Sequence, residues 1–245
     1  MKTTKTTQLA IATLLLGSAS ACNSISAQDM QSIIDMGTQV ASAKGVNVGN
    51  STQLTSGLKQ MLSLSSDRAS SALSSANVWQ LLLPPEAQKM VGTLRSVGLG
   101  RYVDSAQLNL NKAASQAALA SAPVFKQAIN NMSVNDALSI WRGGSSAGTQ
   151  YFRNQTETQL RAKFAPIVQK SMQDTGFYGT YQTALNAYNA IPLSTKPSID
   201  VEGYLVGKTM DSVFNRMALE ETAIRKDPKA RGDALIQAAM GALIK

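Results

Sequence analysis

From residue 81 to the C-terminus, apolar residues recur at spacings of three and four, and this feature restricts the fold more than any other. The spacing is first clear at Met90, Val91 and Leu94. It places apolar side chains on one face of a helix, whereas a half-buried strand needs strict alternation. No stretch of useful length alternates, and no hairpin signal separates two β-rich runs. The sequence therefore predicts one all-α, bundle-like domain of about eight helices over residues 80–245.

Prolines and acidic residues set the expected helix ends. Pro123 is expected to begin a new helix, because proline is tolerated in a first helical turn. Pro166 is expected to kink or break another helix near residues 164–165. Asp200 is expected to be the N-cap of a long helix that ends before Pro228.

The chain before residue 80 has a different composition, rich in Ser, Asn, Gln, Thr and Gly. Its helical patterns are short, and Gly37 and Gly57 interrupt them. One of these patterns uses Leu54, Leu58, Met61 and Leu62. We predict that residues 22–79 form a tether with weak helices, and the alternative is an ordinary N-terminal helical subdomain.

The first residues have the pattern of a secretory signal peptide. Lys2 and Lys5 are followed by a short apolar run over residues 9–16 and by small residues up to Ala21. The run is too short to span a bilayer, which needs about 20 apolar residues. The sequence therefore predicts a signal peptide over residues 1–21 and export from the cytoplasm.

The only cysteine, Cys22, directly follows this segment. Its position resembles the lipobox of bacterial lipoproteins, in which the thiol is acylated and becomes the mature N-terminus. We predict lipidation of Cys22 and, because Asn23 follows it, an outer-membrane anchor on the periplasmic side. The alternative is ordinary cleavage after Ala21 or Ala27, which gives a soluble periplasmic or secreted protein.

The composition excludes several kinds of chemistry. The chain has no histidine and one cysteine, which excludes Ser–His and Cys–His pairs, imidazole metal ligands and a disulfide within the chain. Acidic residues are sparse and no calcium-loop spacing occurs. We therefore expect no enzymatic activity, no metal and no cofactor.

Basic residues outnumber acidic ones, and the net charge of +8 falls to +6 when Lys2 and Lys5 leave with the leader. This balance favours anionic lipid headgroups, cell-wall polymers or acidic envelope proteins as partners. Nucleic acid is not expected, because the chain has no compact Lys/Arg run and no basic–aromatic interleaving.

A glycine- and serine-rich loop is the main predicted binding site. Its backbone N–H groups and hydroxyls precede a helix and are placed to hold an anion, with Arg153 adding positive charge. The predicted anion-binding residues are Gly143, Gly144, Ser145, Ser146 and Arg153. The alternative is a helix stop joined to an N-cap by flexible residues.

Charged residues four apart predict ion pairs on helix surfaces. Arg153, Glu157 and Arg161 share one face, and Glu220 and Glu221 are each four residues from an arginine, namely Arg216 and Arg225. Adjacent carboxylates diverge by about 100° on a helix, so pairing explains them better than catalysis.

Aromatic residues gather in two segments, and each group either belongs to the core or lines a lipid pocket. The groups are Phe177, Tyr178, Tyr181 and Tyr188, and Trp141, Tyr151 and Phe152.

Many short segments, in order, resemble the bacterial family catalogued as domain of unknown function 4197, over about residues 80–245. The resemblance rests on residues 94–100, 103–104, 111–114, 125–129, 132, 136–137, 143–144, 149–153, 164–168, 220–221 and 224–228. It implies an exported helical protein of Gram-negative bacteria and no assigned activity. This chain has Ser145 and Ser146 where the family pattern has acids, and it is neutral at Asn109 and Ser115.

Together these features predict a helical envelope protein or lipoprotein that acts as a non-enzymatic binding or assembly factor. The alternative is a carrier or sensor for an acyl or other apolar ligand or an anionic headgroup. A hydrolase that uses Ser with Lys or carboxylates is the third hypothesis.

Overall fold

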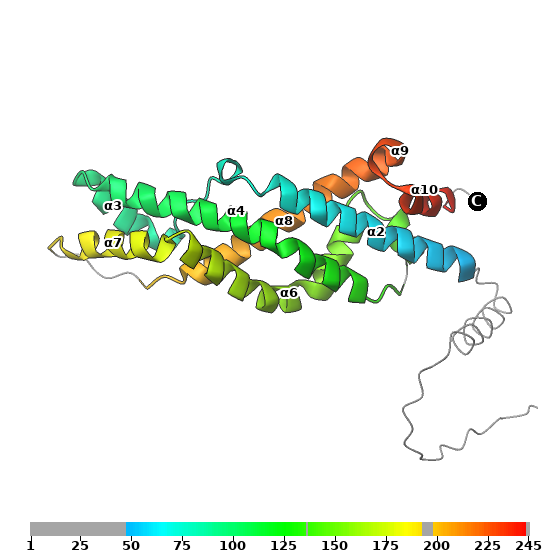
Figure 1. The fold of residues 1–245 in the computed structure, drawn as a ribbon, viewed down its shortest axis with the longest axis horizontal. Helices are drawn as coiled ribbons and strands as arrows, with labels where there is room; N and C mark the ends of the chain where they lie inside the picture. Colours follow the sequence, from blue (N-terminus) through cyan, green and yellow to red (C-terminus); the bar gives the residue numbers. More distant parts are fainter. Residues whose placement is uncertain (1–47, 136, 193–197, 244–245) are drawn as a thin grey trace, which may run out of the picture. The chain divides into compact units, whose positions relative to one another are not determined.

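Four long helices form the framework of the computed structural model, which describes residues 48–135, 137–192 and 198–243 (Figure 1). In the described residues there are nine α-helices and no strand, so the all-α prediction is confirmed. The long helices are α2 (Val48–Ala72), α4 (Gly100–Asn131), α6 (Ala147–Asp174) and α8 (Val201–Lys226). The shorter ones are α3 (Gln88–Ser96), α5 (Ala137–Arg142), α7 (Phe177–Asn189), α9 (Pro228–Arg231) and α10 (Ala234–Gly241), with 3₁₀ turns at Ala76–Val78 and Pro85–Ala87.

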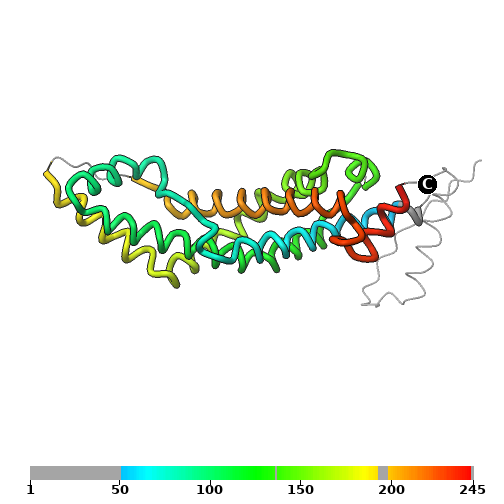
Figure 2. The backbone as a smooth tube through the Cα atoms, turned by 90° about the horizontal axis from the view of Figure 1, so that it is seen from above, coloured from blue at the N-terminus to red at the C-terminus, as the bar shows by residue number. Residues whose placement is uncertain are grey.

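Successive long helices run in opposite directions (Figure 2). Lys59 of α2 donates to the carbonyl of Asn130 in α4 over 2.7 Å, while Asp67, further along α2, pairs with the earlier Lys126 over 2.8 Å. The same reversal occurs from α4 to α6 and from α6 to α8 (Figures 1 and 2). This is the up-down-up-down order of a four-helix bundle.

Three phenylalanines from three helices meet inside the bundle. The ring centroids of Phe125 in α4, Phe152 in α6 and Phe214 in α8 lie 5.3–6.0 Å apart in tilted or edge-on pairs. All three side chains are almost fully buried. Aromatic pairs at these distances prefer such geometries, so the three rings fix how α4, α6 and α8 face one another.

Two prolines do not have the effect that the sequence predicted. Pro123 lies inside α4 and Pro166 inside α6, and both helices continue through them. Each proline removes one backbone hydrogen bond to the carbonyl four residues earlier. Both prolines are exposed, and so are Leu119 and Ala162 at those earlier positions. Water can therefore hydrate the freed carbonyls, and the predicted helix start at Pro123 and break near residues 164–165 are wrong.

Helix α2 belongs to the bundle, in contrast to the predicted tether over residues 22–79. The compact unit that holds the bundle begins at Gly49, and the apolar stripe of α2 lies in the core. The stripe consists of Leu54, Leu58, Met61 and Leu62, all at most 5% exposed. Short side chains such as Ser65 and Ser66 are also fully buried on this helix. A serine-rich segment thus packs closely because its side chains are small.

Gly57 marks the point where α2 crosses α10. A Cβ atom at this position would lie 2.3 Å from the Cβ of Ala239 and 3.5 Å from the Trp141 ring. The Trp141 indole N–H donates to the Leu54 carbonyl over 2.8 Å. The glycine that seemed to interrupt a helical pattern therefore allows a close approach between two helices.

The signal peptide, Cys22 and the first part of the predicted tether lie outside the described residues. Among the helices that the structure describes, none combines the length and the apolar character needed to cross a membrane.

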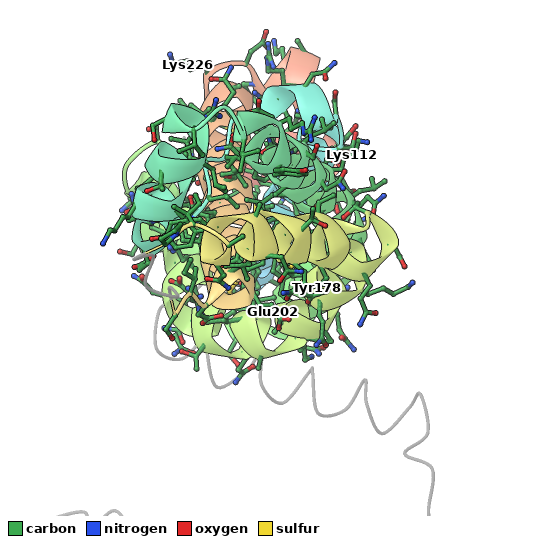
Figure 3. All side chains as sticks on the ribbon, turned by 90° about the vertical axis from the view of Figure 1, so that its left-hand side faces the viewer. Lys112, Tyr178, Glu202 and Lys226 are labelled. Atoms are coloured by element: carbon green, nitrogen blue, oxygen red, sulfur yellow. The ribbon has the colours of Figure 1, made fainter. Side chains whose placement is uncertain are left out.

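Residues at the start of α8 hold α7 in place. Asp200 caps α8, as predicted, by accepting from the Gly203 N–H over 2.8 Å. In the first turn of α8, the Glu202 carboxylate accepts a hydrogen bond from the Tyr178 hydroxyl of α7 (Figure 3). Burial raises the pKa of Tyr178 above its ordinary value, and the hydrogen bond to Glu202 raises it further.

If α2 is part of the core, Leu58→Ala destabilises the protein by about 2–5 kcal/mol, because it leaves a cavity at a fully buried position. Leu219→Ala, at a side chain that is 62% exposed, changes stability by less than about 0.5 kcal/mol. Urea unfolding followed by circular dichroism measures both. Equal small effects would show that α2 is only loosely attached.

The free energy of unfolding should also fall at alkaline pH, because the Tyr178 hydroxyl titrates there. Its pKa is raised by folding, so the unfolded chain loses the proton first, above about pH 10. The stabilising contribution is complete below that pH and is lost as the pH rises towards the folded-state pKa. Tyr178→Phe should therefore lose less stability than the wild type between neutral pH and about pH 11. An identical loss in both proteins would contradict this role.

Candidate functional site

The predicted anion-binding loop connects α5 to α6. The Gly143 N–H donates to the Ile140 carbonyl over 3.2 Å and so ends α5. The Ser145 carbonyl accepts from the Thr222 hydroxyl of α8 over 3.3 Å. Ser146 is the N-cap of α6, and its hydroxyl accepts from the Gln150 side chain over 3.2 Å. Several polar groups of the loop thus form hydrogen bonds with other groups of the protein.

A carboxylate of the protein itself lies at the N-terminus of α6. The Gly148 N–H donates to Oε1 of Glu221 over 3.0 Å, and the Thr149 N–H donates to Oε2 over 2.7 Å. The Thr149 hydroxyl adds a third bond to Oε2 over 2.7 Å. Free N–H groups and the helix dipole make this a favourable place for negative charge. Glu221, which is fully buried on α8, supplies that charge.

Arg225 balances the charge of Glu221 from one turn further along α8. Its Nε donates to Oε1 of Glu221 over 2.9 Å. Its Nη1 and Nη2 donate to the carbonyls of Trp141 and Ile140 at the end of α5, over 2.8 and 3.2 Å. The guanidinium also lies 5.1 Å from the centroid of the Trp141 ring. A cation is favourable at a helix C-terminus for the same reason that an anion is favourable at an N-terminus.

We call this arrangement the Glu221–Arg225 clamp, which comprises those two side chains, Trp141, Gly148 and Thr149. The predicted Glu221–Arg225 pair exists, but it is buried, with side-chain exposures of 0% and 12%. Glu221 and Arg225 pair with each other within α8, and the other bonds of the clamp hold the α5–α6 turn against α8. Because both charges have several hydrogen-bond partners, the pair meets the conditions under which burial of charge is tolerated.

Helix α2 closes the clamp from the other side. A Cβ atom at Gly148 would lie 2.9 Å from Cδ1 of Leu58 and 3.0 Å from Oε1 of Glu221. Only a residue without a side chain lets α2 and Glu221 both approach the backbone of α6 at this point. Gly148 is therefore needed for packing.

Arg153 does not join the loop. Its guanidinium donates to both carboxylate oxygens of Glu157, over 2.9 and 3.1 Å, and to Asp211 of α8. It also lies 5.1 Å from the centroid of the Phe214 ring. The hydrogen bond from Arg153 holds the pKa of Glu157 below its usual value. Anion binding by residues 143–146 stays a prediction, and Arg153 is placed to join α6 to α8.

The other predicted ion pairs are also present. Arg161 lies 3.7 Å from Glu157, and Arg216 lies 2.7 Å from Glu220. With the exception of Glu86, every carboxylate in the described part of the chain takes part in an ion pair, a helix cap or the bond to Tyr178. Within that part, no group of three or more potential metal-ligating side chains comes together.

The aromatic residues that the sequence singled out belong mainly to the core. Phe177 is fully buried and stacks on Tyr181 with 5.4 Å between ring centroids. Tyr188, Trp141 and Phe152 are at most 3% exposed. These side chains fill the interior, as the core alternative predicted.

If the clamp supports the fold, Glu221→Gln should destabilise the protein by about 3–5 kcal/mol, because it leaves the Arg225 charge without its partner. Glu220→Gln is the matched control. Its partner Arg216 is 43% exposed, so the loss should be about 1 kcal/mol or less. Urea unfolding measures both variants, and a loss for Glu221→Gln no larger than that of the control would contradict the clamp.

Comparison with known proteins assigns the chain to a family by its sequence. Comparison with curated proteins and with solved structures gave no match. A family model described as "Protein of unknown function (DUF4197)" matches residues 49–241. The match begins where α2 begins, earlier than the resemblance over about residues 80–245 suggested, and it includes the whole clamp. The chain therefore belongs to the DUF4197 family of proteins of unknown function.

Proposed function

We propose that this chain is a non-enzymatic helical protein of the cell envelope that binds an anionic envelope component through exposed basic side chains. One observation carries the proposal. The described carboxylates, apart from Glu86, have structural partners, whereas several lysines and arginines form no ion pair in that part of the chain. These cations are Lys89, Lys112, Arg142, Lys226 and Lys229, all of them exposed.

The position of two of these lysines supports binding at one end of α8. Lys226 is the last residue of α8, and Lys229 follows in α9 after the capping residue Asp227. Figure 3 shows Lys226 at the outer edge of the bundle. Asp227 uses its carboxylate to accept from the Ala230 N–H over 3.0 Å. The two ammonium groups are therefore available to an external anion.

The proposed location follows from the leader and from Cys22. Acylation at Cys22 would bring the bundle to a membrane, and basic side chains would add attraction to anionic lipids. Two or more acyl chains bind a membrane stably, so diacylation of the Cys22 thiol would be an anchor by itself. Each lysine or arginine near an anionic surface contributes about 1 kcal/mol at physiological ionic strength.

The structure offers less support for the alternative of an apolar-ligand carrier. That function needs an apolar cavity, and the aromatic side chains proposed to line one, such as Phe177 and Phe152, pack against core residues. The buried carboxylates that the structure describes give no support to the hydrolase hypothesis, because Glu220 and Glu221 pair with arginines.

The proposal is tested with the Cys22→Ser form of the chain, which removes acylation and leaves the basic surface. It should sediment with vesicles that contain phosphatidylglycerol and not with pure phosphatidylcholine vesicles. Binding should disappear near 1 M salt, where the screening length falls to about 3 Å. The double variant Lys226→Gln/Lys229→Gln should bind about tenfold to thirtyfold more weakly.

The matched control changes the net charge equally but replaces lysines that already have partners. Lys126 pairs with Asp67 and Lys170 with Asp174, each over 2.8 Å. Lys126→Gln/Lys170→Gln should therefore retain most of the binding. Equal weakening in both double variants would show an effect of net charge alone. Binding to purified anionic cell-wall polymer without binding to vesicles would assign the partner to the wall.

A further inference from the structure

A cleft of about 240 Å³ lies beside the C-terminal end of α4 and the first half of α6. The connection between α4 and α5 forms one of its edges. Met132, Thr156 and Leu160 contribute buried side chains to its lining. Met132 and Leu160 therefore give the floor a small apolar part, and it belongs to the fixed framework of the bundle.

The rim of the cleft consists mainly of amide side chains. Asn131, Asn135, Gln155 and Gln159 line it, and all four residues are exposed. None of these amides forms a hydrogen bond within the described part of the chain. Each offers one acceptor and two donors, so together they present many unused hydrogen-bonding groups around a small apolar floor.

Tyr151 and Lys163 complete the rim from opposite ends of this part of α6. The Tyr151 hydroxyl donates to the Ser133 carbonyl over 3.0 Å, which fixes the orientation of its ring. Lys163 is exposed and makes only a long contact of 3.5 Å with the Gln127 side chain. Among the lining residues that the structure describes, Lys163 is the one charged side chain, and it supplies a positive charge to the rim.

The combination of these groups selects one class of ligand. A sugar ring has a C–H face that packs on an aromatic ring or aliphatic floor, and an edge of hydroxyls that amide side chains bind. An N-acetyl group adds an amide for the rim and a methyl for the floor. A carboxylate on the same sugar would pair with Lys163. A peptide usually needs a free sheet edge or a continuous apolar groove, whereas this cleft lies between described helices and most of its lining residues are polar.

We propose that this cleft binds one unit of an N-acetylated, carboxylate-bearing sugar. Its volume is below the range of about 300–1,000 Å³ for sites that enclose drug-sized ligands. It therefore holds a single ring, and the rest of a longer glycan would extend into solvent. The cleft is distinct from the exposed lysines of α8 and α9, so this inference does not rest on the proposed function.

The test is an NMR titration of the isotopically labelled whole chain with N-acetylmuramic acid. Saturable shifts of the side-chain NH₂ signals of Asn131, Asn135, Gln155 and Gln159 are expected. N-acetylglucosamine, which lacks the carboxylate, should bind several-fold more weakly, and glucose more weakly still. Absence of saturable shifts at these signals would overturn the proposal, as would equal binding of glucose.

Variants separate the roles of the rim residues. Gln159→Ala should weaken binding about tenfold, since it removes hydrogen bonds to the ligand. Lys163→Gln should remove the preference for N-acetylmuramic acid over N-acetylglucosamine. Gln169→Ala changes an exposed amide of the same helix that lies outside the cleft, and it should bind like the wild type. Unchanged affinity and preference in the Gln159 and Lys163 variants would overturn the assignment.

Discussion

The buried pair of Glu221 and Arg225 is the interaction on which the arrangement of the helices most depends. Glu221 satisfies two N–H groups at the start of α6, and Arg225 satisfies two carbonyls at the end of α5. A tight turn between two helices leaves donors and acceptors that must find partners when they are buried. Two side chains of α8, one turn apart, provide both kinds of partner. The turn is thereby attached to a third helix by charge-assisted bonds.

The residues around this pair are small because neighbouring helices approach closely there. Gly148 lets Leu58 and Glu221 approach the same point of α6, and Gly57 lets α2 cross α10 beside Trp141. Alanines such as Ala113 and Ala117 have a similar effect in α4, where they are fully buried. In this bundle the helices pack closely through small side chains instead of filling the space between them with large ones. This explains how a chain with 5% aromatic residues forms a filled core.

The sequence predicted helix content, several helix ends and ion-pair partners, because these depend on residues close together in the chain. Asp200 caps α8 as expected, and each predicted i,i+4 pair is present. The two prolines were misjudged, because proline is tolerated where the freed carbonyl faces water, and exposure is decided by tertiary packing. The apolar stripe of α2 was visible in the sequence. Gly57 and the serine-rich composition hid its place in the core, since the glycine indicates an interruption of the helix and the composition is typical of a tether.

The candidate site was only partly predictable for the same reason. The glycine–serine loop was correctly placed before the start of a helix, and anion binding by residues 143–146 stays a prediction. Nothing in the local pattern showed that Glu221, 72 residues after Thr149, would lie at the N-terminus of that helix. The i,i+4 spacing identified Arg225 as the partner of Glu221. It did not show that the pair is buried, because the spacing indicates which residues share a helix face and not which elements cover that face.

The use of carboxylates inside the fold also explains the character of the surface. In an acid-poor chain, a carboxylate whose orientation is fixed by a cap or an ion pair is not placed to form an ion pair with other cations. Asp200, Asp227 and Asp233 cap helices, and among the described residues lysines such as Lys226 and Lys229 form no ion pair. The same chemistry that orders the interior gives the exterior its positive charge. A partner that supplies negative charge is thus complementary to the fold itself.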